Sequence, residues 1–365
     1  MLANILSILS ILIGFLFIFA ALNDVFQAVI VPRAVGRRFR ISFVLWRGLW
    51  KLWPALAWTV YKGNEDKRED FLALFAPFSL ILLLLVWAMT LIVGYGFIFW
   101  GLRGGFTPPL HSLGQAVYFS GTSALTIGFG DIVGRTAGPR FFSLMAALSG
   151  LSVLSLSTAF LFLLFASFQN REIFVVTVGA RAGNPPSGVS LLTISHYADA
   201  YDDLPRLMVD AQRWIAQVME SHLAYPVLAF FRSSHDYESW IGTMGTLLDA
   251  ATLLMTTIEG TRHGQARLTY NIGRHATHDL VHYFRLNSDD ETAGIDRAEF
   301  DRACDRLVNA GYALHDRDEA WKRFSELRSA YAGHLNAMAR FFEIPPLQWI
   351  GDRSPLPKVT ALPHA

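Results

Sequence analysis

The sequence predicts an all-α membrane protein in which a membrane-embedded part is followed by a separate helical domain. Hydrophobic residues make up 52% of the 365-residue chain and charged residues 17%, and this charged share is low for a soluble protein. Nearly all of the long apolar runs lie before residue 170. Beyond them, apolar residues recur at helical spacing. The net charge of +1 gives no indication of nucleic-acid binding, and we expect none.

Three segments are long enough to cross a bilayer, which takes about 20 apolar residues. They cover residues 2–31, 71–100 and 139–168. The first segment has no Lys or Arg before its apolar core and no convincing small-residue cleavage site, so we interpret it as an uncleaved anchor rather than a signal peptide. We expect residues 1–31 to form an N-terminal transmembrane helix that packs outside the other two.

Basic residues are concentrated between the first two spans, in residues 32–70. They are Arg33, Arg37, Arg38, Arg40, Arg47, Lys51, Lys62, Lys67 and Arg68. Because basic residues favour the cytoplasmic side of a membrane, we predict that the N-terminus and the loop 101–138 lie outside the cell. The C-terminal domain is then cytoplasmic, and the protein is a multi-pass protein of the plasma membrane. The single cysteine, Cys304, excludes an intrachain disulfide framework.

A fourth apolar run, residues 43–61, has two interpretations. Trp46, Trp50, Trp53 and Ala57 recur at helical spacing, which favours an amphipathic helix lying at the inner membrane interface. The alternative is a further span. It would leave the first arginine cluster outside, against the trend for basic residues.

The loop between the second and third spans contains a short helix and a glycine-rich turn. Residues 110–125 are mostly apolar or small, but they are too few to cross a bilayer. Pro108 and Pro109 precede them and suit a helix start. The next residues, 126–131, read Thr-Ile-Gly-Phe-Gly-Asp. Since irregular backbone at membrane depth must be buried in protein or line a water-filled path, we predict a half-membrane helix that enters from outside and returns through residues 126–131.

This order of span, half-helix, TIGFGD and span resembles the pore module of potassium channels over residues 71–168. The resemblance implies a homotetramer, in which three further copies complete a ring of carbonyl oxygens that replaces the hydration shell of K⁺. K⁺ is the permeant ion, and no organic cofactor is expected. The implied filter consists of Thr126, Ile127, Gly128, Phe129 and Gly130, with Asp131 at the outer mouth and Tyr118, Phe119 and Thr122 as filter support.

Elementary chemistry agrees with this interpretation of the turn. Gly128 and Gly130 permit the alternating backbone twist that turns successive carbonyls toward one axis. A plain glycine-rich turn in an outer loop is the simpler alternative. That alternative explains the glycines, but it explains neither the preceding half-length helix nor Thr126.

The third span carries candidate hinge and gate residues. Gly150 lies twenty residues after Gly130, where the family often has a hinge glycine. Leu154 and Thr158 share its face at four-residue spacing, and Leu161 and Phe165 continue that face. One interpretation is that this face lines a cavity and narrows it at the cytoplasmic end, since a hydrophobic constriction can gate by dewetting. The other is that these residues pack against neighbouring helices.

In the remainder of the chain we predict a linker over residues 169–194, with a short strand at 173–178. A helical domain over 195–345 and a tail over 346–365 are expected to follow. Neither G-x-G-x-x-G after a strand nor a P-loop is present, so we assign no nucleotide site. No catalytic Ser-His-Asp or Cys-His grouping has a convincing local context, and we expect no enzymatic activity. We interpret the domain as regulatory, with an unidentified ligand or protein partner.

Three histidines in this domain, His275, His278 and His282, are spaced to share one helix face. Such a face could hold a metal ion or respond to pH near neutrality. The alternative is an ordinary polar face.

Among three functions we predict the first, which the resemblance implies, and the other two are its alternatives. The first is a potassium-selective channel, whose cytoplasmic domain could control gating. The second is a membrane-anchored sensor or scaffold with a non-conducting pore module, and the third is a weakly selective cation channel.

Overall fold

The computed structural model describes residues 2–31, 41–183, 185–233, 238–260, 264–288 and 294–350. The chain divides into two compact units, Met1–Phe165 and Ala166–Ala365. The predicted apolar spans are helices, and within the described ranges three stretches are long and apolar enough to cross a membrane: Asn4–Ile30, Glu65–Gly101 and Ala137–Ala182. The basic cluster at 32–40 and the tail from 351 onward lie outside the described residues.

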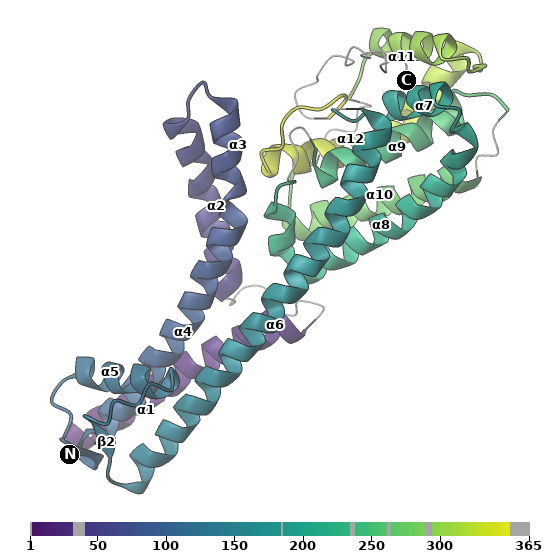
Figure 1. Cartoon of the computed structure of the whole chain (residues 1–365). Coiled ribbons are helices and arrows are strands. Elements are labelled where there is room, and N and C mark those ends of the chain that lie inside the picture. The colour runs from purple at the N-terminus through teal and green to yellow at the C-terminus, as the bar shows by residue number, and fades with distance from the viewer. Residues whose placement is uncertain are drawn as a thin grey trace. The chain divides into compact units, whose positions relative to one another are not determined.

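The first unit is built from helices and one small two-stranded sheet (Figure 1). In chain order the helices are α1 (Leu2–Val25), which continues as a π-helical turn (Phe26–Ile30), α2 (Ile41–Val60), α3 (Glu65–Ala73), α4 (Phe75–Gly101) and α5 (Leu113–Ala124). Helix α6 (Ala137–Ala182) begins in this unit and ends in the second. The strands β1 (Phe106–Thr107) and β2 (Val133–Gly134) pair antiparallel on either side of α5 in the sequence. This pairing closes the loop that holds α5.

Helices α1 and α4 pack closely along their length because glycines face each other. A side chain at Gly14 would collide with the backbone of Gly94, and small residues of this kind let membrane helices approach. Nearer the start of α1, the Ser10 hydroxyl donates a hydrogen bond to the carbonyl of Phe97 at 2.7 Å. The N-terminal helix therefore packs against α4, the helix of the second predicted span.

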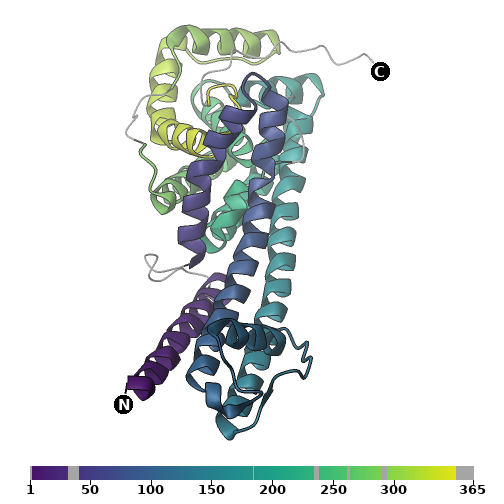
Figure 2. The same ribbon diagram turned by 90° about the vertical axis from the view of Figure 1, so that its left-hand side faces the viewer.

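Helix α2 lies beside α3 and the first turns of α4 (Figure 2). Trp50 contacts Phe75 edge-on, and Trp53 stacks on Phe78 with ring centroids 5.2 Å apart. The tryptophan stripe is thus covered by protein. A different face of α2, which carries Leu52 and Leu56, is exposed, and a position at the membrane interface stays a prediction for that face.

The second unit is helical. After the end of α6 come α7 (Gly188–Tyr197), α8 (Leu204–Ala224), α9 (Trp240–Thr256), α10 (Gly264–Phe284), α11 (Arg297–Asn309) and α12 (Arg317–Phe341). Helix α9 is buried on all sides, with α7, α10 and α12 packed against it. A helix that is apolar all round belongs in the centre of a bundle, so α9 forms the core of this unit.

Inside that core, Asp249 of α9 and Arg328 of α12 form an ion pair at 2.9 Å. The Tyr331 hydroxyl also donates to Asp249, at 2.7 Å. Burial is the main cause of a raised pKa at Asp249, and the nearby Arg328 opposes that rise. Because removing one partner would leave the other charged group buried and uncompensated, this cluster fixes how α9 and α12 pack.

Two domain boundaries predicted from the sequence are wrong. The expected linker 169–194, with its strand at 173–178, is instead helical as far as Ala182, and α7 begins at Gly188. The β-branched run there suggests a strand, but packing overrides propensity: Phe174 stacks on Trp214, and Val175 and Val178 are buried. The tail is also shorter than predicted, because Leu347, Trp349 and Ile350 are buried in the domain.

Candidate functional site

The chain segment after α5 has an unusual backbone. Helix α5 begins at Leu113, where the Ser112 side chain caps it, and ends at Ala124. Left-handed residues then occupy every second position: Thr126 with φ of 57°, Gly128 with 60° and Gly130 with 79°. The sequence predicts this twist at the two glycines but gives no sign of it at Thr126. Alternation between left- and right-handed residues brings successive N–H groups to one side of the chain, which turns the carbonyls to the other side.

The N–H groups of this segment are held by the end of α5. The carbonyl of Thr122 accepts hydrogen bonds from the backbone N–H groups of Ile127, at 2.8 Å, and Gly128, at 3.2 Å. The Thr122 hydroxyl itself donates to the carbonyl of Phe119 at 3.0 Å. Thr122 therefore supports the segment through its main chain, a role that its side-chain type could not predict.

The two aromatic residues predicted as support behave differently. Phe119 is buried and meets Phe99 and Phe106 edge-on, each with centroids 5.0 Å apart. Tyr118 is partly exposed, and its hydroxyl donates a hydrogen bond to a carboxylate oxygen of Asp131 at 3.0 Å. Tyr118 thus connects α5 to the residue that follows the glycine-rich turn.

Residues 125–131 are exposed throughout their length in a single chain. Ile127 is 51% exposed and Phe129 67% exposed. In one chain, therefore, the half-helix leaves much of both side chains uncovered. A segment of irregular backbone and exposed apolar side chains is incomplete as it stands, since such backbone at membrane depth must be covered by protein or line a water-filled path.

The candidate gate residues of α6 share a face that is open in one chain. Leu154, Thr158, Leu161 and Phe165 are exposed, whereas Phe160 is buried. Exposure in one chain agrees with both interpretations of this face, which are a cavity lining and a contact with helices of neighbouring subunits. Helix α6 runs through Gly150 without a break, and the hinge role of Gly150 stays a prediction. A side chain there would collide with the carbonyl of Ala124, so Gly150 permits close packing of α6 on the end of α5.

One buried acidic residue links three elements of the first unit. The Asp24 carboxylate of α1 accepts hydrogen bonds from the Trp87 indole N–H at 2.7 Å and from the Ser42 N–H at 3.0 Å. No local pattern in the sequence marks Trp87 as a partner of Asp24. The Trp87 ring in turn lies 6.5 Å from that of Phe160 on α6.

The three histidines of α10 do lie along one helix, but their geometry does not fit a metal ion. Among the described residues, no three His, Cys, Asp or Glu side chains come together as a metal site. His275 and His278 instead approach Asp279, at 3.5 Å and 3.2 Å. The rings of His278 and His282 are stacked with centroids 6.5 Å apart, and all three histidines are exposed. The prediction of a pH response stays open.

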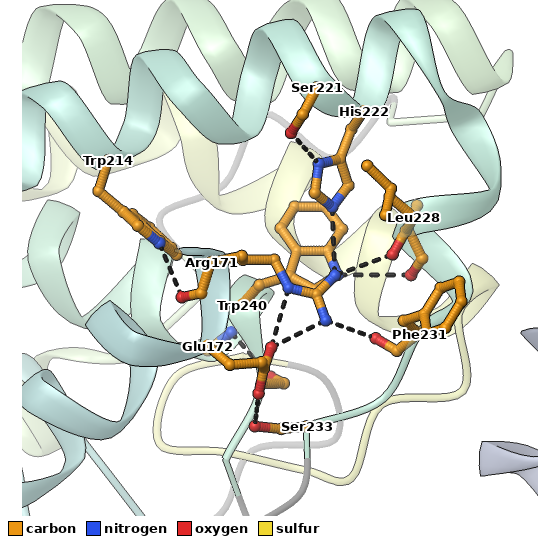
Figure 3. A network of polar contacts seen from close by, with 12 residues as sticks. Arg171, Glu172, Trp214, Ser221, His222, Leu228, Phe231, Ser233 and Trp240 are labelled. Atoms are coloured by element: carbon orange, nitrogen blue, oxygen red, sulfur yellow. Dashed lines mark hydrogen bonds and ion pairs between the residues drawn. The ribbon is translucent and has the colours of Figure 1, made fainter. Parts of the chain in front are cut away.

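A polar network that sequence reasoning missed surrounds Arg171 near the end of α6 (Figure 3). Arg171 is 3% exposed. Its guanidinium donates to the carbonyls of Leu228 and Phe231, each at 2.8 Å, and forms an ion pair with Glu172 at 2.8 Å. Glu172 also accepts a hydrogen bond from Ser233. An Arg-Glu pair after an apolar run suggests a solvated helix end, so only the fold reveals this burial.

His222 completes the network, and its tautomer follows from its partners. Arg171 can only donate, and its Nη1 lies 3.3 Å from His222 Nε2, so Nε2 carries the lone pair and Nδ1 carries the proton. Ser221 Oγ lies 3.1 Å from that Nδ1. Burial, and secondarily the charge of Arg171, hold the pKa of His222 well below its usual value.

Taken together, two apolar helices, a short helix between them and a left-handed turn define a membrane module with a re-entrant loop. Residues 80–166 match the model of the ion channel family Ion_trans_2, and this match supports an ion-channel pore module in this part of the chain. The chain is also similar to the uncharacterized membrane protein YdjJ of Bacillus subtilis strain 168, with 22% identity over 222 residues. That alignment covers 57% of this chain and 64% of the Bacillus protein. No solved structure matches the chain.

Proposed function

We propose that the protein is a potassium-selective channel that conducts passively through a homotetrameric pore. Four copies of residues 126–130 surround the axis, and the carbonyl oxygens of these residues take the place of water around K⁺. The Thr126 hydroxyl contributes at the inner end and the Asp131 carboxylate attracts cations at the outer mouth. Conduction by this route needs no chemistry from the protein beyond coordination.

The observation that carries this proposal is the alternation of left-handed residues at Thr126, Gly128 and Gly130. It is supported by the bonds from Ile127 and Gly128 to Thr122, which occupy the N–H groups of the turn and leave its carbonyls for an ion. The exposure of the whole segment in one chain agrees with a ring that only several chains complete. In a tetramer, neighbouring subunits cover Ile127 and Phe129.

The proposed setting is the plasma membrane, with the filter loop outside and the helical unit in the cytoplasm. This orientation rests on the basic residues between the first two spans. Helices α1 and α4 are antiparallel neighbours, since Gly14 meets Gly94 while Asp24 meets Trp87. The N-terminus therefore lies at the same end of the module as the filter loop.

Flux measurements on purified protein in liposomes test the proposal. The wild-type protein is expected to pass K⁺ and exclude Na⁺, with reversal potentials that follow the K⁺ gradient. Gly128→Ala is expected to lose this selectivity, because its φ of 60° strains any residue with a Cβ. Gly63→Ala is the matched control, since Gly63 has a φ of 80° with open space around it and lies in the turn before α3.

The other outcomes identify the rival functions. An intact tetramer without flux means a membrane-anchored sensor or scaffold. Equal passage of K⁺ and Na⁺ means a weakly selective cation channel. If Gly63→Ala abolishes selectivity as fully as Gly128→Ala, the filter assignment is wrong.

Control of gating by the helical unit is the second part of the proposal. Arg171 belongs to the same helix that begins beside the filter loop, and it is buried among carbonyls of the helical unit. A movement of that unit therefore moves the end of α6 with it. Arg171→Gln removes the charged contacts and is expected to change the open probability in bilayer recordings. Arg181→Gln, at an exposed position of the same helix, is the control, and equal open probabilities in all three proteins would exclude this role for Arg171.

A further inference from the structure

Helix α6 is longer than a membrane span requires, so its last part extends past the membrane. At about 1.5 Å per residue, the 46 residues of this helix extend about 69 Å, whereas a bilayer core takes about 20 residues. Gln169, Asn170 and Arg171 interrupt the apolar sequence. The helix that follows, to Ala182, therefore lies beyond the hydrocarbon core, where lipid does not cover its exposed apolar side chains.

One face of this helix end is fixed to the helical unit. Arg171, Val175, Val178 and Ala182 are each at most 3% exposed. Arg171 makes the charged contacts described above, and its carbonyl accepts a hydrogen bond from the Trp214 indole N–H at 3.1 Å (Figure 3). That face has its partners within the chain.

The opposite face is exposed and carries a regular pattern. The exposed residues Ala166, Gln169, Ile173, Val176 and Ala180 are separated by alternating steps of three and four, and Asn170, Thr177 and Arg181 are exposed beside them. Ile173 is 66% exposed and Val176 36% exposed. Steps of three and four are the a/d spacing of a left-handed coiled coil, whose seam repeats every 3.5 residues on average.

We propose that this face, defined here as the α6 seam (residues 166, 169, 173, 176 and 180), packs against the same face of three other copies. The four helix ends then form a parallel coiled coil on the pore axis. The inference rests on the proposed tetramer, because the symmetry that joins four filter loops brings four copies of α6 around one axis. It goes beyond the pore, since it assigns a second contact between subunits outside the membrane.

The composition of the α6 seam suits packing against the same face of other copies of the chain. β-Branched Ile173 and Val176 supply apolar layers, and alanines at both ends let the helices approach. Gln169 is the polar layer, and a polar residue in such a seam fixes the register and the number of strands at some cost in stability. A lone helix face of this kind in water would instead be expected to carry charged residues.

Disulfide trapping in proteoliposomes tests the α6 seam. The natural thiol does not interfere, because Cys304 is buried and its burial raises the pKa of the thiol to about 11. Ile173→Cys and Val176→Cys, introduced one at a time, are expected to give covalent dimers on a denaturing gel after oxidation with copper-phenanthroline. Arg181→Cys is the control, since Arg181 is exposed on the same helix but points about 100° away from the centre of the seam.

Native mass measurement of the same samples tests the tetramer and the α6 seam separately. Tetramers that crosslink through positions 173 and 176 but not through 181 support the α6 seam. Tetramers that do not crosslink at 173 or 176, or that crosslink equally at 181, overturn it and leave the tetrameric pore standing. A protein that is monomeric in its native state overturns both.

Discussion

The hydroxyl of Tyr118 donates a hydrogen bond to the carboxylate of Asp131 across 3.0 Å. Tyr118 lies in the middle of α5, and Asp131 directly follows the last left-handed residue of the turn. The bond thus holds the outer end of the turn, while the Thr122 carbonyl holds its inner part. Between these two attachments lie the residues proposed to contact the ion.

Removing this bond should loosen the outer mouth of the filter. Tyr118→Phe keeps the ring but loses the donor, so Asp131 becomes free to move. We expect shorter open bursts in single-channel recordings and a lower preference for K⁺ over Na⁺. Asp131→Asn should act less strongly, because its amide oxygen still accepts from Tyr118. The double variant should be no worse than Tyr118→Phe in burst length, as expected for residues that act through one contact; additive effects would contradict a shared bond.

A methyl group at Gly150 should separate α6 from the end of α5. In Gly150→Ala, the new side chain meets the carbonyl of Ala124, and overpacking of this kind costs about 1–3 kcal/mol. We expect a lower temperature of tetramer dissociation and a loss of current. Gly138→Ala is the control on the same helix, since a side chain there would meet Leu102 only at an ordinary distance of 3.6 Å. Equal effects of the two changes would show that Gly150 has no special packing role.

The buried carboxylate of Asp24 should be replaceable by an amide but not by a hydrocarbon. In Asp24→Asn, the amide oxygen can take the place of Oδ2, which accepts from Trp87 and from the Ser42 N–H. The new NH₂ group can donate to the Ser42 hydroxyl, now 3.1 Å from Oδ1. Asp24→Leu leaves both buried N–H groups unsatisfied, at about 1–3 kcal/mol each.

Thermal unfolding in detergent measures this difference. The temperature of unfolding should fall further for Asp24→Leu than for Asp24→Asn. An equal fall for both variants would mean that the negative charge of Asp24, which both variants lack, stabilises the packing of α1 on α4 rather than its two acceptor oxygens.

Acid should destabilise the helical unit through His222. Its pKa is lowered in the folded protein by burial and by Arg171, whereas the unfolded chain binds a proton near pH 6.5. Because the unfolded state then holds more protons, stability is full above about pH 6.5 and falls below it, by at most about 1.4 kcal/mol per pH unit for one group.

The urea midpoint of unfolding, measured between pH 7.5 and pH 5.5, checks this expectation. His222→Gln should have a shallower dependence on pH, because glutamine can still accept from Arg171 but does not titrate. The half-buried His334, whose pKa is also lowered by burial, is unchanged in both proteins and contributes equally. Identical slopes would exclude His222 as a source of the pH dependence.

The amino-acid sequence by itself determined the features that depend on local patterns. Lengths of apolar runs located the membrane helices, since the bilayer thickness sets them. The residues Thr126–Asp131 indicated the pore module through their resemblance to potassium channels. Gly128 and Gly130 indicated left-handed backbone, because few other residue types tolerate it. Apolar residues at helical spacing likewise indicated a helical domain after the membrane part.

Only the tertiary structure decided which distant residues meet. Propensity suggested a strand at 173–178, but contacts such as Phe174 with Trp214 keep the segment helical. The partners of Asp24 and Arg171 lie 63 and 51 residues away in Trp87 and His222, and no local pattern marks such pairs. The free energy of burying a charged group depends on donors and acceptors that the fold brings to it, so those contacts appear only when the chain is folded.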